Sequence, residues 1–250
     1  MDGAISIRDN KTGGSAARIG EAVTCGTVGI LYGGRGDLDH EFPFCRSSVR
    51  KFRRGEVIAG AGDAIDMFAR VQRGMVSAST PLADGREFIV EIIPKGGLIG
   101  ELEVLRKQSL SLEYRASADC ELHYFDGRLL RDLCANDPQF QVKILSKALA
   151  RVSELELRII SNAGSSLRQR LARTLLRLSA LYKVDAQHSG DELLISQHDL
   201  AATLPASREK VNQCLRRLRE SKVVDGTQGK IRILNRKALE AYADGVEALA

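Results

Sequence analysis

The pattern of apolar and polar positions divides the chain into a β-rich part and a helical part. From about Phe44 to Phe125, short runs of β-branched and aromatic residues alternate with glycine-containing breaks, as in strands joined by turns. Asp84-Gly85 lies between two of these runs and predicts a hairpin turn. Many short strands at close spacing predict a barrel or a sandwich. The predicted strands are Val49–Phe52, Val57–Ala59, Phe68–Arg73, Val76–Pro81, Glu87–Ile93, Tyr114–Ala118 and Glu121–Phe125.

A long helix is predicted after Asp137-Pro138, because Asp at the N-cap followed by Pro at the first helical position is a strong start signal. Four apolar residues of this helix recur at steps of four, three and four, which is the spacing of a seam that packs against a partner helix. The alternative is a seam buried against the chain's own domain. The residues of the predicted dimer seam are Ala148, Val152, Leu155 and Ile159.

The last third of the chain predicts three helices and a hairpin. Ser196 and Ser207 each precede a short amphipathic run, and serine is a favoured N-cap. The two short helices that follow, joined by a tight turn at Pro205-Ala206, predict a helix-turn-helix. The predicted elements are helices Leu167–Lys183, Gln197–Leu204 and Ser207 to about Lys222, and a hairpin from Val223-Val224 to Lys230–Leu234. The predicted buried stripe of the last helix is Val211, Cys214, Leu215 and Leu218.

Together these elements predict an α+β protein with four parts. The first 40 residues hold nine of the 23 glycines, so we expect an irregular extension at residues 1–43. A β-rich domain at 44–136, a long helix at 137–166 and a helical domain at 167–250 follow it.

Charge is spread unevenly along the 250 residues. Residues 1–166 carry 22 basic and 22 acidic side chains, whereas residues 167–250 carry 15 basic against 10 acidic and so hold the whole net charge of +5. A basic C-terminal domain suits a polyanion such as double-stranded DNA. The alternative is a solvated surface of charged helices.

Several other classes of protein are disfavoured. No run of apolar residues is long enough for a membrane helix, and the N-terminus has no export signal, so we expect a cytoplasmic protein with no membrane contact. The five widely spaced cysteines favour free thiols over disulfides or a metal cluster. Cys214 is interpreted as part of the apolar stripe rather than as an oxidation switch. No P-loop, nucleotide-binding glycine motif, serine elbow or paired-His motif occurs, so we do not expect an enzyme.

The start of the second short helix carries the residue types that read base edges in the major groove. Arginine donates two hydrogen bonds to guanine, glutamate accepts from cytosine, and glutamine pairs with adenine. Arg208, Glu209 and Gln213 have these identities. The predicted DNA-binding set is Ser207, Arg208, Glu209, Lys210, Gln213 and Arg216.

From about Arg46 to Leu234 the sequence resembles the Crp/Fnr superfamily of bacterial transcription regulators. The resemblance rests on four stretches of sequence: Lys95-Gly96-Gly97-Leu98-Ile99-Gly100-Glu101-Leu102, Arg115-Ala116, the long helix after Asp137-Pro138, and Ser207-Arg208-Glu209-Lys210-Val211. It implies a cyclic-nucleotide-binding-type, jelly-roll-like β-roll, a dimerisation helix and a C-terminal winged helix-turn-helix. It further implies a homodimer that regulates transcription from a palindromic site and contacts RNA polymerase.

Carried over from this resemblance, Arg208 would read guanine and Glu209 the cytosine side of a half-site. Gln213 stands where the cyclic-AMP receptor protein has a further base-reading arginine, so we expect a different half-site preference there. Pro205 replaces the usual turn glycine, and since proline cannot adopt the left-handed conformation, the turn must be built differently.

The resemblance also implies an effector pocket at Gly100, Glu101 and Ser111. Glu101 matches the residue that holds the ribose in cyclic-AMP-binding relatives, but Leu110-Ser111 stands where they have the Arg-Ser pair that binds the phosphate. Leu155-Glu156 replaces the Thr-Ser pair that contacts adenine, and a carboxylate near an anionic ligand is unfavourable. Binding of a cyclic nucleotide in the familiar mode is therefore disfavoured.

Two alternatives remain open. One is a cyclic-AMP-activated regulator with an altered phosphate pocket, in which Arg106 or Lys107 supplies the cation. The other is a ligand-binding regulatory module that acts through protein contacts, with the winged helix as the interaction surface.

Overall fold

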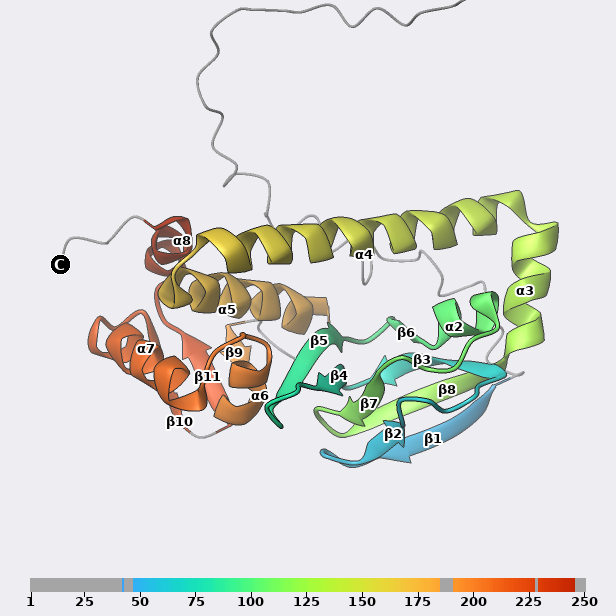
Figure 1. The fold of residues 1–250 in the computed structure, drawn as a ribbon, viewed down its shortest axis with the longest axis horizontal. Coiled ribbons are helices and arrows are strands. Elements are labelled where there is room, and N and C mark those ends of the chain that lie inside the picture. Colours follow the sequence, from blue (N-terminus) through green and yellow to red (C-terminus); the bar gives the residue numbers. More distant parts are fainter. Residues whose placement is uncertain (1–41, 43–46, 185–190, 228, 246–250) are drawn as a thin grey trace, which may run out of the picture.

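The computed structural model describes Phe42 and residues 47–184, 191–227 and 229–245. The predicted irregular extension at 1–43 therefore lies outside the described residues, apart from Phe42. The described chain is an α+β protein, as predicted, with a β-roll followed by helices and a winged helix-turn-helix (Figure 1). Within the described ranges, no helix is long and apolar enough to cross a membrane.

Two four-stranded antiparallel sheets form the β-roll. The first has the order β1 (Ser48–Phe52), β8 (Cys120–Asp126), β3 (Met67–Arg73) and β6 (Leu98–Ile99). The second has the order β2 (Val57–Ala59), β7 (Glu113–Ala116), β4 (Val76–Pro81) and β5 (Glu87–Ile93). All seven predicted strands are confirmed to within two residues at their ends, and so is the hairpin between β4 and β5.

Inward-facing residues of both sheets fill the roll, and Val71, Val76 and Leu122 are fully buried. A second cluster of aromatic rings closes the end of the roll near the start of the long helix. The ring of Phe42 lies 5.1 Å from that of Phe68, 5.3 Å from that of Phe125 and 5.7 Å from that of Phe140. This cluster joins Phe42 to the roll and to the start of α4.

Two helices of the roll were not predicted from the sequence pattern. Helix α2 (Glu101–Arg106) follows Gly100, which has a φ of 78°. A Cβ atom at Gly100 would also lie 2.6 Å from the side chain of Ile65, so this turn requires glycine. Helix α3 (Gly127–Asn136) is capped by the side chain of Asp126. These turns fix where Glu101 and the following long helix begin.

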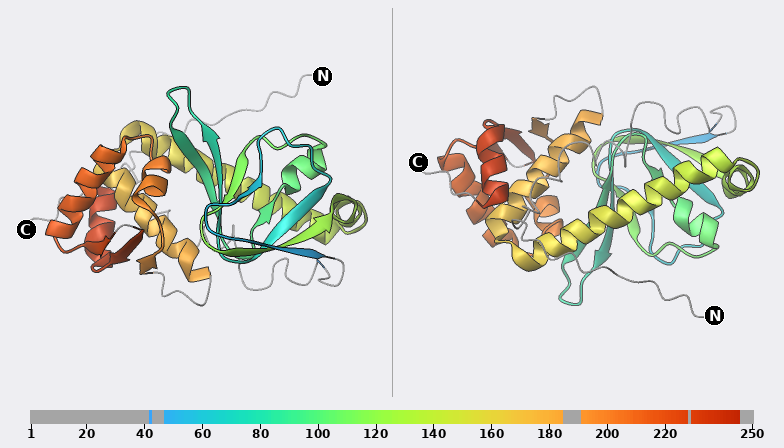
Figure 2. Two further views of the ribbon diagram at one scale, coloured as in Figure 1. Left: turned by 90° about the horizontal axis from the view of Figure 1, so that it is seen from below. Right: turned by 90° about the horizontal axis from the view of Figure 1, so that it is seen from above.

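The long helix α4 runs from Pro138 to Gly164 and confirms the predicted start signal, because the Asp137 side chain accepts hydrogen bonds from the backbone N–H groups of Gln139 and Phe140. Figures 1 and 2 show α4 crossing over the roll and continuing along the C-terminal region. Three arginine contacts tie it to its own chain: Arg158 donates to the backbone oxygen of Val90, Arg173 to the Ser161 hydroxyl and Arg177 to the Glu154 carboxylate.

The C-terminal region forms a winged helix-turn-helix. It consists of α5 (Leu167–Val184), β9 (Glu192–Leu193), α6 (Gln197–Ala202), α7 (Arg208–Glu220), β10 (Val224–Thr227), β11 (Lys230–Ile233) and α8 (Arg236–Asp244). The three predicted helices and the hairpin are confirmed, although α6 ends two residues before its predicted end. The three-stranded sheet has the order β10-β11-β9. Helix α8, which packs against α5, and strand β9 were not predicted.

Candidate nucleic-acid interface and internal pocket

The helix-turn-helix is held by two serine caps, as predicted. The hydroxyl of Ser196 accepts from the backbone N–H of Asp199 at 2.9 Å, and that of Ser207 accepts from the backbone N–H of Lys210 at 3.4 Å. The turn between them contains no residue with positive φ, so Pro205 fits it without strain. The turn is thus built without the left-handed conformation that glycine usually supplies.

The buried stripe of α7 fixes which side of the helix faces outward. Val211, Leu215 and Leu218 are almost completely buried, whereas Cys214 is only half-buried. Three of the four predicted stripe residues are thus in the core, and Cys214 lies at its margin. The described cysteines Cys120, Cys134 and Cys214 are all free thiols.

The first turns of α7 present polar side chains to solvent. Arg208, Glu209, Lys210 and Gln213 are exposed, and their side chains form no ion pair or hydrogen bond with the residues that the structure describes. Ser207 is half-buried because it caps the helix. Arg216 is exposed and lies 3.7 Å from Glu220 in an i,i+4 pair, which contributes little in solvent. The end of α7 that the sequence assigned to base reading is therefore accessible.

The wing has its basic side chains partly neutralised. The Glu192 carboxylate of β9 accepts from Lys230 at 2.5 Å and from Arg232 at 3.2 Å. Hydrogen bonds from these two side chains lower the pKa of Glu192. The wing therefore offers less free positive charge than its sequence suggests.

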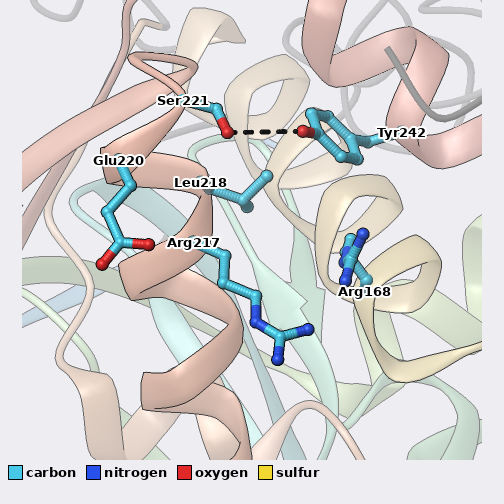
Figure 3. A pocket seen from close by; sticks show the side chains of 6 residues that line it. All are labelled: Arg168, Arg217, Leu218, Glu220, Ser221 and Tyr242. Atoms are coloured by element: carbon cyan, nitrogen blue, oxygen red, sulfur yellow. Dashed lines mark hydrogen bonds between the residues drawn. The ribbon is translucent and has the colours of Figure 1, made fainter. Parts of the chain in front are cut away.

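A cavity of about 340 Å³ lies at the other end of α7, between α5, α7 and α8. Figure 3 shows Arg217 of α7 and Arg168 of α5 at this cavity, beneath a contact of 3.5 Å between the hydroxyls of Tyr242 and Ser221. This contact joins the C-terminal end of α7 to α8. Arg217 lines this cavity near the C-terminal end of α7, whereas the residues assigned to base reading begin at its N-terminal end.

A second, smaller cavity of about 50 Å³ lies between the roll and α4, where the sequence places the effector pocket. Arg151 of α4 enters it and forms an ion pair with Glu91 of β5, while its other terminal nitrogen lies 3.9 Å from Glu101. The side chains of Glu91 and Glu101 are only 12% and 17% exposed. Burial raises the pKa of Glu101 to about 7, and the positive charge of Arg151 opposes that rise. The cavity is lined by Glu91, Gly97, Leu98, Glu101, Leu102, Ile144, Lys147, Ala148 and Arg151.

The predicted effector residues are only partly brought together. Gly100 and Glu101 form the start of α2 at this cavity, but the placement of Ser111 in the pocket is wrong. Leu110 turns into the core, where it is 3% exposed, so the side chain of the next residue, Ser111, lies in solvent. Arg106 and Lys107 are also exposed and do not line the cavity. Arg151 was not predicted from the sequence, although its spacing of seven residues from Arg158 places both on one side of α4.

The exposed apolar face of α4 differs from the predicted seam in register. Val152 and Ile159 are 51% and 68% exposed. Ala148 lines the cavity instead and Leu155 is half-buried, so these two residues face the chain's own domain. The exposed apolar side chains of α4 are Val142, Leu145, Leu149, Val152, Ile159 and Ile160.

Comparison with known proteins agrees with this arrangement of a roll, a long helix and a winged helix. The cyclic nucleotide-binding domain family matches residues 49–137 and the Crp-like helix-turn-helix domain family matches residues 169–242. Together they define a transcription regulator with a sensor-type roll and a DNA-binding domain. The chain belongs to the Crp/Fnr family of DNA-binding transcription regulators.

Individual relatives are distant. The chain is 25% identical over 179 residues to the cAMP-activated global transcriptional regulator Vfr of Pseudomonas aeruginosa. The aligned region covers 70% of this chain and 84% of Vfr. It is 24% identical over 195 residues to the HTH-type transcriptional regulator Cmr of Mycobacterium tuberculosis, over 78% of this chain and 76% of Cmr. The structure of FixK2 from Bradyrhizobium japonicum has the same fold, with a TM-score of 0.68 at 21% identity, over 82% of this chain and 98% of FixK2.

Proposed function

We propose that the protein binds an inverted repeat in duplex DNA as a homodimer, and that α7 reads each half-site. The observation that carries this proposal is the exposed and uncommitted set of side chains at the start of α7. Arg208 suits guanine and Glu209 suits the cytosine side of the half-site, while Gln213 suits adenine. The Ser207 cap orients the turn that carries them.

The exposed stripe of α4 supports pairing with a second copy of the chain. Val142, Leu145, Leu149 and Val152 follow steps of three, four and three, and Ile159 comes seven residues later. This is the spacing of a helix-pairing seam. A symmetric dimer covers the same stripe on both copies and places two recognition helices on successive major grooves, about 34 Å apart.

The uneven charge supports the same partner. The excess of five positive charges lies in residues 167–250, on the side of the chain that carries α7. We further propose a cytoplasmic regulator that acts with RNA polymerase and not as an enzyme, in line with the regulators to which the chain is similar.

The experiment that tests this function is selection of bound sequences from a random duplex library by the purified protein. We expect enrichment of an inverted repeat, and its loss in Arg208→Ala. Arg128→Ala is the matched control, because Arg128 is an exposed arginine on α3 at the opposite end of the molecule (Figure 1). Absence of duplex binding even at low salt would contradict the proposal and favour a module that acts through protein contacts.

A further inference from the structure

The pocket between the roll and α4 contains a charged side chain of the protein itself, that of Arg151. We propose that the guanidinium of Arg151 is a built-in ligand of this pocket, so that DNA binding by this protein neither needs nor responds to a cyclic nucleotide. The inference concerns regulation and rests on the proposed function for its readout by DNA binding.

The space in the pocket supports this inference. The cavity has a volume of about 50 Å³, whereas pockets for small organic ligands begin at about 300 Å³. Arg151, Lys147 and Ala148 close it from the side of α4, and Glu101 and Leu102 close it from the side of α2. A nucleotide would have to displace the Arg151 side chain to enter.

The charges in the pocket point the same way. Its ionisable lining residues are two carboxylates, Glu91 and Glu101, and two cations, Lys147 and Arg151. Arg151 is already paired with both carboxylates, and Lys147 also has a partner. A cyclic phosphate would have to compete with these carboxylates for the guanidinium of Arg151, the only one that the described residues place in the cavity lining, and the carboxylates would repel it.

The pairing also links α4 to the DNA-binding region. Arg151 contacts Glu91, and Arg158 donates to the backbone oxygens of Val90 and Ile89, so three consecutive residues of β5 are held by α4. At its other end β5 contacts α6, where Glu87 lies 3.7 Å from His198. Contacts therefore run without a break from the pocket to the helix-turn-helix.

The first test is binding of cyclic AMP and cyclic GMP to the wild-type protein by equilibrium dialysis, together with DNA affinity in their presence and absence. We expect no retained nucleotide at millimolar concentration and a DNA affinity that changes by less than about twofold. Saturable binding of either nucleotide, or an increase in DNA affinity of about tenfold or more, would overturn the proposal.

The second test is Arg151→Ala with chemical rescue. Removal of the side chain leaves a cavity between two carboxylates, so we expect DNA affinity to fall about tenfold or more and millimolar ethylguanidinium to restore most of it. Ethylurea, which has a similar shape and no charge, should not restore it. Arg106→Ala, an exposed arginine on α2 outside the cavity, should behave as the wild type.

The result that would overturn the inference is an Arg151→Ala protein with wild-type DNA affinity, or one that is folded, weakened and unresponsive to ethylguanidinium. If Arg151→Ala does not fold, nucleotide binding to the wild type still decides the matter. If the wild type binds no DNA at all, the proposed function fails, and a rise in the thermal stability of Arg151→Ala with ethylguanidinium separately tests whether the pocket takes a guanidinium.

Discussion

The pocket beneath α4 and the first turn of α7 both place arginine next to glutamate, but they use the pair in opposite ways. In the pocket, Arg151 is paired with Glu91 and Glu101 and mostly buried. On α7, Arg208 and Glu209 are exposed, and neither has a partner among the described residues. A charge with an internal partner joins two parts of the fold, whereas a charge without one is left for an external ligand.

The largest expected effect is on stability, at the pocket. Arg151→Ala leaves two mostly buried carboxylates without their cation, so the free energy of unfolding should fall by about 3–5 kcal/mol. Urea unfolding followed by circular dichroism measures this change. Arg106→Ala should change the same quantity by less than about 0.5 kcal/mol. A loss below about 1 kcal/mol for Arg151→Ala would show that the pair is not a structural link.

The pH dependence of stability tests the ionisation of Glu101, one of the two carboxylates in the pocket. The pKa of Glu101 is about 7 in the folded protein, raised from 4.5 by burial, so between these pH values the folded state holds a proton that the unfolded state has lost. The contribution of protonated Glu101 is thus fully present below about pH 4.5 and is lost as pH rises through 7.

Subtracting the unfolding free energy of Glu101→Gln from that of the wild type at each pH isolates this contribution. We expect the difference to fall by about 3 kcal/mol between pH 4.5 and pH 8. A difference that is flat across this range would mean that Arg151 keeps Glu101 ionised throughout.

At the exposed pair the expected effect is on binding rather than on stability. Arg208→Ala should weaken the specific site by about 1–3 kcal/mol and leave unfolding unchanged, because the side chain forms no hydrogen bond or ion pair with the described residues. Fluorescence anisotropy with the selected duplex and with a random duplex measures both affinities. An equal loss of affinity for the two duplexes would mean that Arg208 contacts a phosphate and does not read a base. The control Arg128→Ala should change neither affinity.

The smallest expected effect concerns Glu156, an exposed charge of α4 that forms no ion pair with the described residues. Glu156 lies four residues after Val152 and three before Ile159, in line with the exposed stripe of α4. In a symmetric pair the two Glu156 side chains face each other, so Glu156→Leu should tighten the dimer by about 1 kcal/mol. Sedimentation equilibrium measures this, with Asp132→Leu, at an exposed acidic residue of α3 outside the stripe, as the control. Unchanged or weaker self-association would place Glu156 outside the interface.

Local signals in the sequence predicted much of the fold. The Asp137-Pro138 start of α4, the Ser196 and Ser207 caps and the alternating strands of the roll are all encoded within a few neighbouring residues. The short helix α2 lacks such a signal, because its start depends on the left-handed Gly100. Helix α8 has a local start signal in its Asn235 cap, but this helix was not predicted.

The candidate site was predicted less completely where it depends on contacts between distant residues. Arg151 and Glu91 are separated by 60 positions, and no periodicity links them. Ser111 was placed by counting from Glu101, but the backbone between them turns Leu110 inward. In α4, apolar residues recur at steps of three and four along two neighbouring faces of the helix. The sequence pattern does not distinguish these faces, and packing against the roll decides that Ala148 faces inward.

The burial of Phe42 means that the packed core of the roll includes a residue that precedes its first strand. Its ring contacts those of Phe68, Phe125 and Phe140, although it precedes β1 by six positions. An expression fragment that starts at the first strand would lose the one ring that contacts those of Phe68, Phe125 and Phe140 at the junction of the roll with α4. A fragment that retains Phe42 keeps this aromatic cluster complete, so Phe42 belongs with the roll in any expression fragment.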